Sequence, residues 1–218
     1  MVLPRSFRWR EFGPWHWILF SGLAVICLLL LPLGGWAWWS SYQSRGLAEL
    51  DLATPRIREA QSPQASAELR AEAIKALESV IERYPWLTAL PQAAYQLGNL
   101  RYQAKQFDRA REAYQLALAK GARGSLATLC RLGIGYAWEA QGDHANALAA
   151  FQAALQGLTA QDFLYEELLV NVARSHELLG QRDRAREAYQ RLLKDLPQSR
   201  RAEEIRSRLA SLEAPARP

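Results

Sequence analysis

The chain has 218 residues, of which half are hydrophobic, with 27 lysines and arginines against 22 aspartates and glutamates. Basic and acidic residues alternate along the predicted helix surfaces, as in Arg109, Arg111 and Glu112, which excludes the continuous basic face that nucleic-acid binding requires. The two cysteines, Cys27 and Cys130, fall in an apolar segment and in a predicted repeat helix, which excludes a disulfide framework.

The N-terminal region contains no Asp, Glu, Lys or Arg between Glu11 and Arg45. Residues 15–39 form an apolar run that would measure about 37 Å as a helix, enough to cross a hydrocarbon core of about 30 Å. We therefore predict a transmembrane helix at 15–39 behind a flank at 1–14. A cleaved signal peptide is disfavoured, because tryptophans stand where a peptidase requires small residues. Tryptophans favour the headgroup boundary, and the predicted membrane anchors are Trp15, Trp17, Trp36, Trp38 and Trp39.

Arginines on the N-terminal flank indicate the orientation. Arg5, Arg8 and Arg10 crowd this flank, whereas Arg45 is the basic residue close behind the apolar run. By the positive-inside rule, the N-terminus is expected in the cytoplasm and everything after Trp39 outside it.

Beyond the apolar run we predict a connector at 40–63 with a short helix at 42–52, because Pro55 and Pro63 interrupt any continuous helix. An amphipathic helix follows at 64–83, whose partner must come from the weakly patterned segment upstream. A capping helix at 199–212 and a disordered tail at 214–218 end the chain. The helices expected between them form pairs: 91–104 with 108–120, 126–140 with 144–156, and 162–179 with 182–193.

An internal repeat covers most of the chain. The octapeptide DRAREAYQ occurs at 108–115 and again at 183–190, 75 residues later. Four alanines recur at spacings of 37, 37 and 38 residues, each followed four positions later by a large residue. The alanines are Ala73, Ala110, Ala147 and Ala185, and the large residues are Leu77, Tyr114, Phe151 and Tyr189. Such a period predicts one helical unit stacked on copies of itself.

These positions resemble the tetratricopeptide repeat, whose units carry a glycine midway along the first helix, a small residue early in the second and an aromatic residue four later. The matching residues, expected to pack the repeats, are Gly98, Ala110 and Tyr114, then Gly135, Ala147 and Phe151, and finally Ala185 and Tyr189. In the last unit Ala173 replaces the glycine. The resemblance covers 64–213. It implies an all-α fold, in which the transmembrane helix precedes an α-solenoid of about three and a half helix-turn-helix repeats and a capping helix.

The sequences at the ends of two repeats resemble one branch of the tetratricopeptide family. RYP at 83–85 and DLP at 195–197 are similar to the bacterial envelope branch of the family, which includes cell-division coordinators and the ancillary subunit of the SecYEG translocon. This resemblance implies a single-pass protein of the cell inner membrane with a periplasmic repeat domain. Its expected partners are envelope or translocon-associated proteins.

No residues show the spacing of a catalytic, metal-binding or cofactor-binding site. His16, His144 and His176 lie far apart in the sequence and form no ligand motif. The segment GIGYAW around Gly133 lies inside a helical repeat with no preceding strand, so it does not indicate a nucleotide loop. We therefore predict no enzyme activity, no cofactor and no metal.

The expected function is recognition of another protein. In the tetratricopeptide family the first helix of each unit lines a concave groove. The family register assigns to this groove Gln92, Tyr95, Gln96, Asn99, Tyr102, Gln103, Leu132, Tyr136, Glu139, Asn171, Arg174 and Glu177. Tyr, Asn and Gln suit an extended peptide or a helix. The alternative is a structural membrane protein that assembles on itself through its repeat array.

Overall fold

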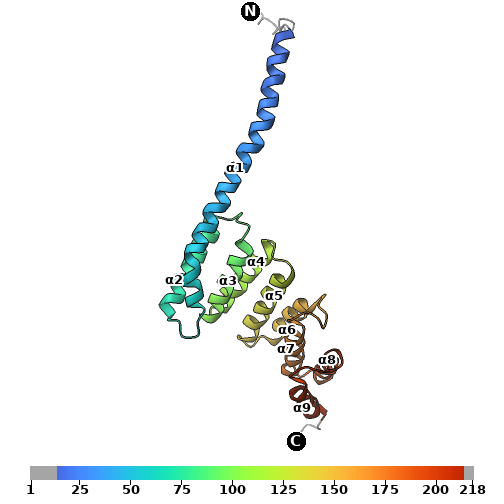
Figure 1. Ribbon diagram of the computed structural model, residues 1–218. Coiled ribbons are helices and arrows are strands. Elements are labelled where there is room, and N and C mark those ends of the chain that lie inside the picture. Colours follow the sequence, from blue (N-terminus) through green and yellow to red (C-terminus); the bar gives the residue numbers. More distant parts are fainter. Residues whose placement is uncertain (1–13, 214–218) are drawn as a thin grey trace, which may run out of the picture. The chain divides into compact units, whose positions relative to one another are not determined.

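The computed structural model describes residues 14–213, and every regular element in this range is an α-helix (Figure 1). In chain order the helices are α1 (Pro14–Ala60), α2 (Ala67–Arg83), α3 (Leu90–Gln103), α4 (Phe107–Ala119), α5 (Gly124–Glu139), α6 (His144–Leu155), α7 (Tyr165–Leu178), α8 (Arg182–Asp195) and α9 (Ala202–Glu213). The chain divides into two compact units, residues 1–45 and residues 46–218. The second unit contains the helical repeat array.

The first helix corrects the prediction of a transmembrane span at 15–39. α1 does not end near Trp39 but continues to Ala60, and its later turns carry Arg45 and Glu49, charges that are costly in hydrocarbon. Within the described part of the chain, no helix combines the length and the apolar character that crossing a bilayer requires. The predicted membrane-spanning helix is therefore wrong, and so is the single-pass inner-membrane localisation that depended on it.

The structure describes the side chains of three of the five tryptophans that were predicted as membrane anchors. Trp36, Trp38 and Trp39 are exposed, and the rings of Trp38 and Trp39 stack on Tyr42 with centroids 5.8 and 6.0 Å away. The side chains of Trp15 and Trp17 lie outside the described residues. The arginines of the flank at 1–13 and the tail at 214–218 lie outside them as well.

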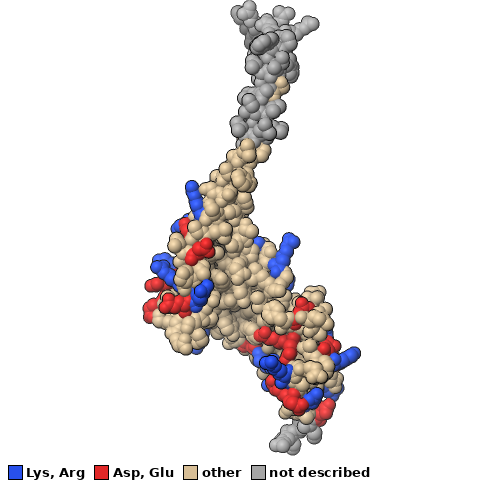
Figure 2. All heavy atoms as spheres, in the orientation of Figure 1, with Lys and Arg blue, Asp and Glu red and all other residues tan. Residues whose placement is uncertain are grey.

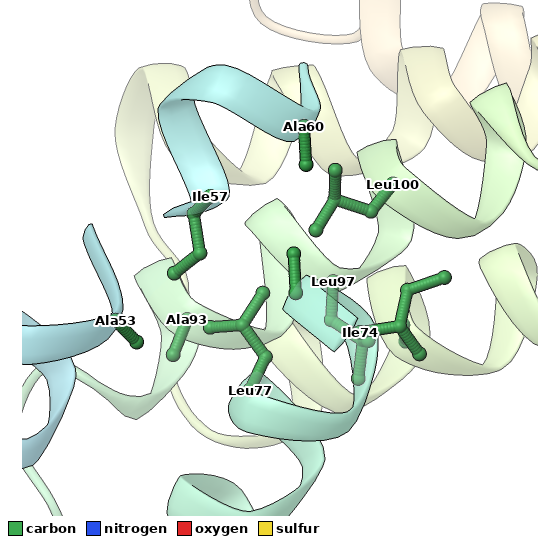
Figure 3. Close-up of a cluster of buried hydrophobic side chains, with 10 residues drawn as sticks. Ala53, Ile57, Ala60, Ile74, Leu77, Ala93, Leu97 and Leu100 are labelled. Atoms are coloured by element: carbon green, nitrogen blue, oxygen red, sulfur yellow. The ribbon is translucent and has the colours of Figure 1, made fainter. Parts of the chain in front are cut away.

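The first helix pair of the array consists of the end of α1 and α2. The Ser66 hydroxyl caps α2 by accepting a hydrogen bond from the Leu69 amide at 3.1 Å. The segment 46–60 of α1 is the upstream partner that the helix at 64–83 required. It continues as helix through Pro55, where a break was predicted. Buried apolar residues of four helices form one cluster (Figure 3): Ala53, Ile57 and Ala60 of α1, Ala73, Ile74 and Leu77 of α2, Ala93, Leu97 and Leu100 of α3, and Ala113 of α4.

The later helices pack in chain order. Each of α4, α6 and α8 packs against the helix before it and against the helix after it, so every second helix joins its own repeat to the next. The repeated alanines Ala73, Ala110, Ala147 and Ala185 have no exposed surface. A methyl side chain at this point lets neighbouring helix backbones approach closely, and the large residue four positions later is buried beside it.

Candidate functional site

Glycines in the first helices pack against rings in the second helices. A β-carbon at Gly98 on α3 would lie 2.5 Å from the Tyr114 ring on α4, and one at Gly135 on α5 would overlap the Phe151 ring on α6. Real β-carbons do not approach other atoms this closely. The two positions therefore accept a larger residue only if the rings or helices shift.

Gly133 has a packing role that the sequence analysis missed. A β-carbon at Gly133 would lie 2.5 Å from the Tyr114 ring, which belongs to the preceding repeat. Tyr114 thus packs between Gly98 of its own repeat and Gly133 of the next. Residues two apart on a helix point about 200° away from each other, so Gly133 and Gly135 serve opposite neighbours. The spacing G-x-G inside a repeat helix was the signal that could have revealed this.

Six of the predicted groove residues lie on α3. We call them the α3 face: Gln92, Tyr95, Gln96, Asn99, Tyr102 and Gln103. The two tyrosine rings are held by aromatic neighbours, since Tyr95 lies 5.9 Å from Tyr114 and Tyr102 lies 5.5 Å from Phe107, measured between ring centroids. Asn99 accepts a hydrogen bond from the Tyr114 hydroxyl at 2.8 Å.

The remaining polar groups of the α3 face are open. Gln92 and Gln103 are exposed, and Gln96 is half-buried. Within the described part of the chain, no hydrogen bond joins the side-chain amides of these glutamines or the hydroxyls of Tyr95 and Tyr102 to another group. Arg101, the one charged residue of α3, bonds instead to Glu78 of α2 at 2.6 Å. The α3 face is therefore neutral and has free donors and acceptors.

The predicted groove residues on α5 and α7 are bonded to one another. The Tyr136 hydroxyl donates to Glu167 at 2.5 Å and accepts from the Asn171 amide at 2.9 Å. Arg174 donates to both carboxylate oxygens of Glu139, at 2.6 and 2.7 Å. These bonds join two successive repeats, so the groups they involve are already satisfied inside the protein.

The last two predicted groove residues also face other parts of the array. Leu132 is buried in the apolar cluster between α5, α6 and α7. The carboxylate of Glu177 lies 3.5 Å from Arg208 of α9. The predicted groove thus divides into an open part on α3 and a part on α5 and α7 that is bonded internally.

The hydroxyls of this region remain protonated. Burial raises the pKa of Tyr136 to about 12, and the hydrogen bond to Glu167 adds to the shift. Burial also raises the pKa of Tyr102, with a further contribution from the charge of Glu139 on α5. At neutral pH both tyrosines act as hydrogen-bonding groups and not as bases.

A charged contact joins the second and third repeats. The Arg111 guanidinium on α4 lies over the Trp138 ring on α5 and bonds to Asp108 and Gln141. Arg186, at the same place in the second octapeptide, pairs among the described residues with Asp183 alone, at 3.1 Å. The duplicated sequence therefore has different neighbours at its two positions.

Groups with possible chemical reactivity are separated or inert in the described residues. No three His, Cys, Asp or Glu side chains of this part lie close enough together to hold a metal ion. The Nδ1 atom of His176 lies 2.6 Å from the Gln181 side-chain oxygen. Burial raises the pKa of the Cys130 thiol to about 11, which keeps it protonated and unreactive at neutral pH. The side chain of His16 lies outside the described part.

Comparison of the chain with models of known protein families gives one match. The model of the tetratricopeptide repeat-like domain matches residues 9–214. No curated protein matches the chain. Among solved structures, the chain is similar to the MamA protein, with 17% identity and a TM-score of 0.47 over 82% of this chain and 79% of that one. It is also similar to a thermophilic TPR protein of Thermus thermophilus, with 17% identity and a TM-score of 0.33 over 79% of this chain and 97% of that one.

Proposed function

Since the chain belongs to the family of tetratricopeptide repeat-like domains, we propose that it is a non-enzymatic scaffold that binds another protein through the α3 face. Stacked helical repeats generally mediate binding between proteins, because the array presents an extended surface. The observation that carries the proposal is that polar side-chain groups of the α3 face are available to bind a ligand. Among the described residues, its glutamine amides and tyrosine hydroxyls have no hydrogen-bond partner, whereas Tyr136 on α5 and Arg174 on α7 are bonded internally.

The chemistry of the α3 face favours a polypeptide segment as the ligand. Glutamine side chains donate and accept hydrogen bonds as the peptide group does, so they suit main-chain recognition. Tyrosine adds apolar contact with a polar tip, a combination that is enriched at interfaces. Figure 2 shows charged side chains gathered over α2 and over α7–α9, with a largely uncharged surface over α3. The unit ends at 83–85 and 195–197 favour an envelope or translocon-associated protein as the partner.

A neutral surface makes a specific prediction about ionic strength. Salt weakens attraction between exposed charges and has little effect on hydrogen bonds and apolar contacts. Binding through the α3 face should therefore change less than about threefold in Kd when salt is raised from about 0.05 M to 0.5 M.

The proposal is tested by site-specific photocrosslinking in the full-length chain. A photoreactive amino acid replaces Gln92, Gln96 or Gln103 in separate variants, and the same amino acid at Gln115, an exposed glutamine on α4, is the matched control. We expect the three α3 positions to capture one common polypeptide, identified by mass spectrometry, that Gln115 does not capture. Adding Gln96→Arg should abolish capture from Gln92 and Gln103.

Two outcomes contradict the proposal. Equal capture from Gln115 and from the α3 positions would show non-selective contact. Capture of a second copy of the chain alone would favour the homo-oligomeric alternative, and sedimentation of the purified protein would then give the number of copies.

A further inference from the structure

Residues 31–40 of α1 form an apolar helix surface that is open to solvent. Every residue of this stretch is exposed, and none of them is charged. Leu31 is 74% exposed and Trp38 is 59% exposed. Exposed apolar surface of this extent marks an interaction site, because covering it releases water.

Gly34 and Gly35 in this stretch differ from the helical glycines of the repeat array. Among the described residues, a β-carbon at either position would have no neighbouring atom within 4 Å beyond its own turn of helix. In the array, by contrast, a β-carbon at Gly98, Gly133 or Gly135 would strike an aromatic ring of a neighbouring helix. Glycine weakens a helix interior relative to alanine, and close packing offsets that loss in the array. The described residues provide no such packing for Gly34 and Gly35.

Trp38 lies on the same side of α1 as these two glycines. Residues three and four apart share a side of a helix, so Trp38 lies one turn after the glycines and Leu31 one turn before them. The Trp38 ring stacks on Tyr42, with the centroids 5.8 Å apart, and this contact holds the ring in place. This side of α1 therefore carries a large ring and, one turn away, open space of the kind that receives rings elsewhere in the chain. We call it the α1 face: Leu31, Gly34, Gly35, Trp38 and Tyr42.

We propose that the α1 face binds a second copy of the chain, with the two helices antiparallel and Trp38 of each copy packed on Gly34 and Gly35 of the other. The two-fold axis passes near residue 36, since Trp38 must lie at the height of the glycines. The same register sets Leu31 of one copy opposite Tyr42 of the other. Each copy supplies both the ring and the space for a ring, as a two-fold interface requires. In a parallel pair the two rings would meet each other and the glycines would face glycines.

Packing of a ring on glycine is also how this chain joins its own helices. Tyr114 packs between Gly98 and Gly133, and Phe151 packs on Gly135. The α1 face contains both parts of that contact, which favours a second copy over an unrelated partner. Since no Asp, Glu, Lys or Arg occurs between Glu11 and Arg45, charge does not oppose the pairing.

The area of the α1 face indicates a weak dimer. The exposed parts of Trp38 and the neighbouring Trp39 amount to about 250 Å² per copy. Together with Leu31, two copies bury less than roughly 1,200 Å² in total, the lower bound of standard interfaces. We therefore expect a reversible dimer with a Kd in the micromolar range.

A dimer formed in this way carries two α3 faces. A partner with two binding segments could occupy both at once, which raises its apparent affinity without any new contact. The α1 face and the α3 face share no residue, so each can be altered without changing the other.

The proposal is tested by sedimentation equilibrium of the full-length chain over a range of concentrations. Trp38→Ala should raise the Kd of the dimer at least about tenfold, because it removes the ring. Gly34→Leu should also raise it at least about tenfold, because the new side chain fills the space that the ring occupies. Gly34→Leu makes the surface more apolar, so a loss of dimer in this variant separates a fitted contact from non-specific association. Circular dichroism checks that each variant keeps its helices.

Trp36→Ala is the matched control. Trp36 is 69% exposed, but it lies two residues from both Gly34 and Trp38, about 200° around the helix axis. Its removal should change the Kd less than about twofold, because the ring lies outside the contact. Equal losses for Trp36→Ala and Trp38→Ala, tighter association of Gly34→Leu, or a chain that is monomeric at every concentration would overturn the proposal.

Disulfide crosslinking measures the orientation of the two helices. A mixture of the Leu31→Cys and Ser41→Cys variants, with Cys27 and Cys130 replaced by serine, should form a mixed disulfide, because the two positions oppose each other in the antiparallel pair. Leu31→Cys alone should not crosslink, since its two copies lie about 15 Å apart along the axis. Crosslinking of Leu31→Cys with itself as fast as the mixture would show a parallel pair and contradict the proposed packing.

Two further measurements separate this inference from its alternatives. If a chain that is monomeric alone binds phosphatidylcholine vesicles, and Trp36→Ala and Trp38→Ala weaken that binding equally, the apolar surface binds lipid and the proposed dimer is wrong. Gln96→Arg on the α3 face should leave the Kd of the dimer unchanged, so failure of one surface is distinguishable from failure of the other.

Discussion

The guanidinium carbon of Arg111 lies 3.5 Å from the centroid of the Trp138 ring, across the boundary between two repeats. The Arg111 side chain is 10% exposed, and its nitrogens bond to Asp108 on its own helix and to Gln141 beyond α5. A cation on an aromatic face is worth most when water is excluded, so this contact stabilises the junction between α4 and α5.

Arg111→Ala should lower the free energy of unfolding by about 2 kcal/mol, because it removes a largely buried cation–ring contact and the hydrogen bonds of Arg111 to Asp108 and Gln141. Arg186→Ala is the control. Arg186 pairs only with an exposed aspartate, so its loss should cost less than about 0.5 kcal/mol. Urea unfolding of both variants measures the difference, and equal losses would show that the Trp138 contact contributes nothing.

Tyr114→Phe and Tyr189→Phe should have different effects although both tyrosines belong to the same octapeptide. The Tyr114 hydroxyl donates to Asn99, so its removal should cost about 1 kcal/mol. In the part of the chain that the structure describes, no group lies in hydrogen-bonding geometry with the buried Tyr189 hydroxyl, and Arg174 stands where Asn99 stands in the earlier repeat. Its removal should be neutral or stabilising by less than about 1 kcal/mol. Thermal unfolding of the two variants measures the change in stability. A larger loss of stability for Tyr189→Phe than for Tyr114→Phe would contradict this prediction.

Gly98→Ala and Gly133→Ala should each destabilise the protein by about 1 to 3 kcal/mol, because the added methyl group meets the Tyr114 ring from opposite sides. The loss should outweigh the gain of about 1 kcal/mol that alanine gives a helix interior. In a Tyr114→Leu background the same substitutions should cost clearly less, since the ring atoms are gone. A double-mutant cycle by urea unfolding measures this, and additive losses would disprove the contact.

Acid should weaken the contact between Tyr165 and Asp195. The Tyr165 hydroxyl donates to Asp195 at 2.5 Å, and this bond, followed by Arg191, lowers the pKa of the carboxyl. A lowered folded-state pKa contributes stability above the unfolded value of about 3.9, and that contribution is lost as the pH falls through the folded value. Wild type should therefore exceed Asp195→Asn in stability at pH 7, and the gap should close below about pH 4. A gap that persists at about pH 2 would contradict this cause.

The repeat geometry could be predicted from the sequence because it depends on local spacing. Ala110 and Tyr114 recur in register, and this period alone indicates which helix sides pack together. The helices predicted at 108–120 and 144–156 are α4 (Phe107–Ala119) and α6 (His144–Leu155) in the structure. Short turns leave little freedom for such boundaries.

The prediction for the N-terminal region was wrong because it judged the apolar run in isolation. The helix that contains this run extends through Pro55 and buries Ala53 and Ile57 against α2 and α3, contacts that hydropathy alone does not reveal. The sequence also could not reveal that the predicted groove divides into an open part on α3 and an internally bonded part on α5 and α7. Tyr136 bonds to Asn171 at a separation of 35 residues, and only the stacked repeats bring the two together.

The two copies of DRAREAYQ should tolerate mutation unequally. Substitution of Arg186 in the second copy removes one exposed ion pair, with Asp183. Substitution of Arg111 in the first copy removes the contact with Trp138 that joins two repeats. In a library of random variants selected for solubility, substitutions should therefore be far more frequent at Arg186 than at Arg111. The position of a repeat in the array, and not its amino-acid sequence alone, therefore determines how well a residue tolerates substitution.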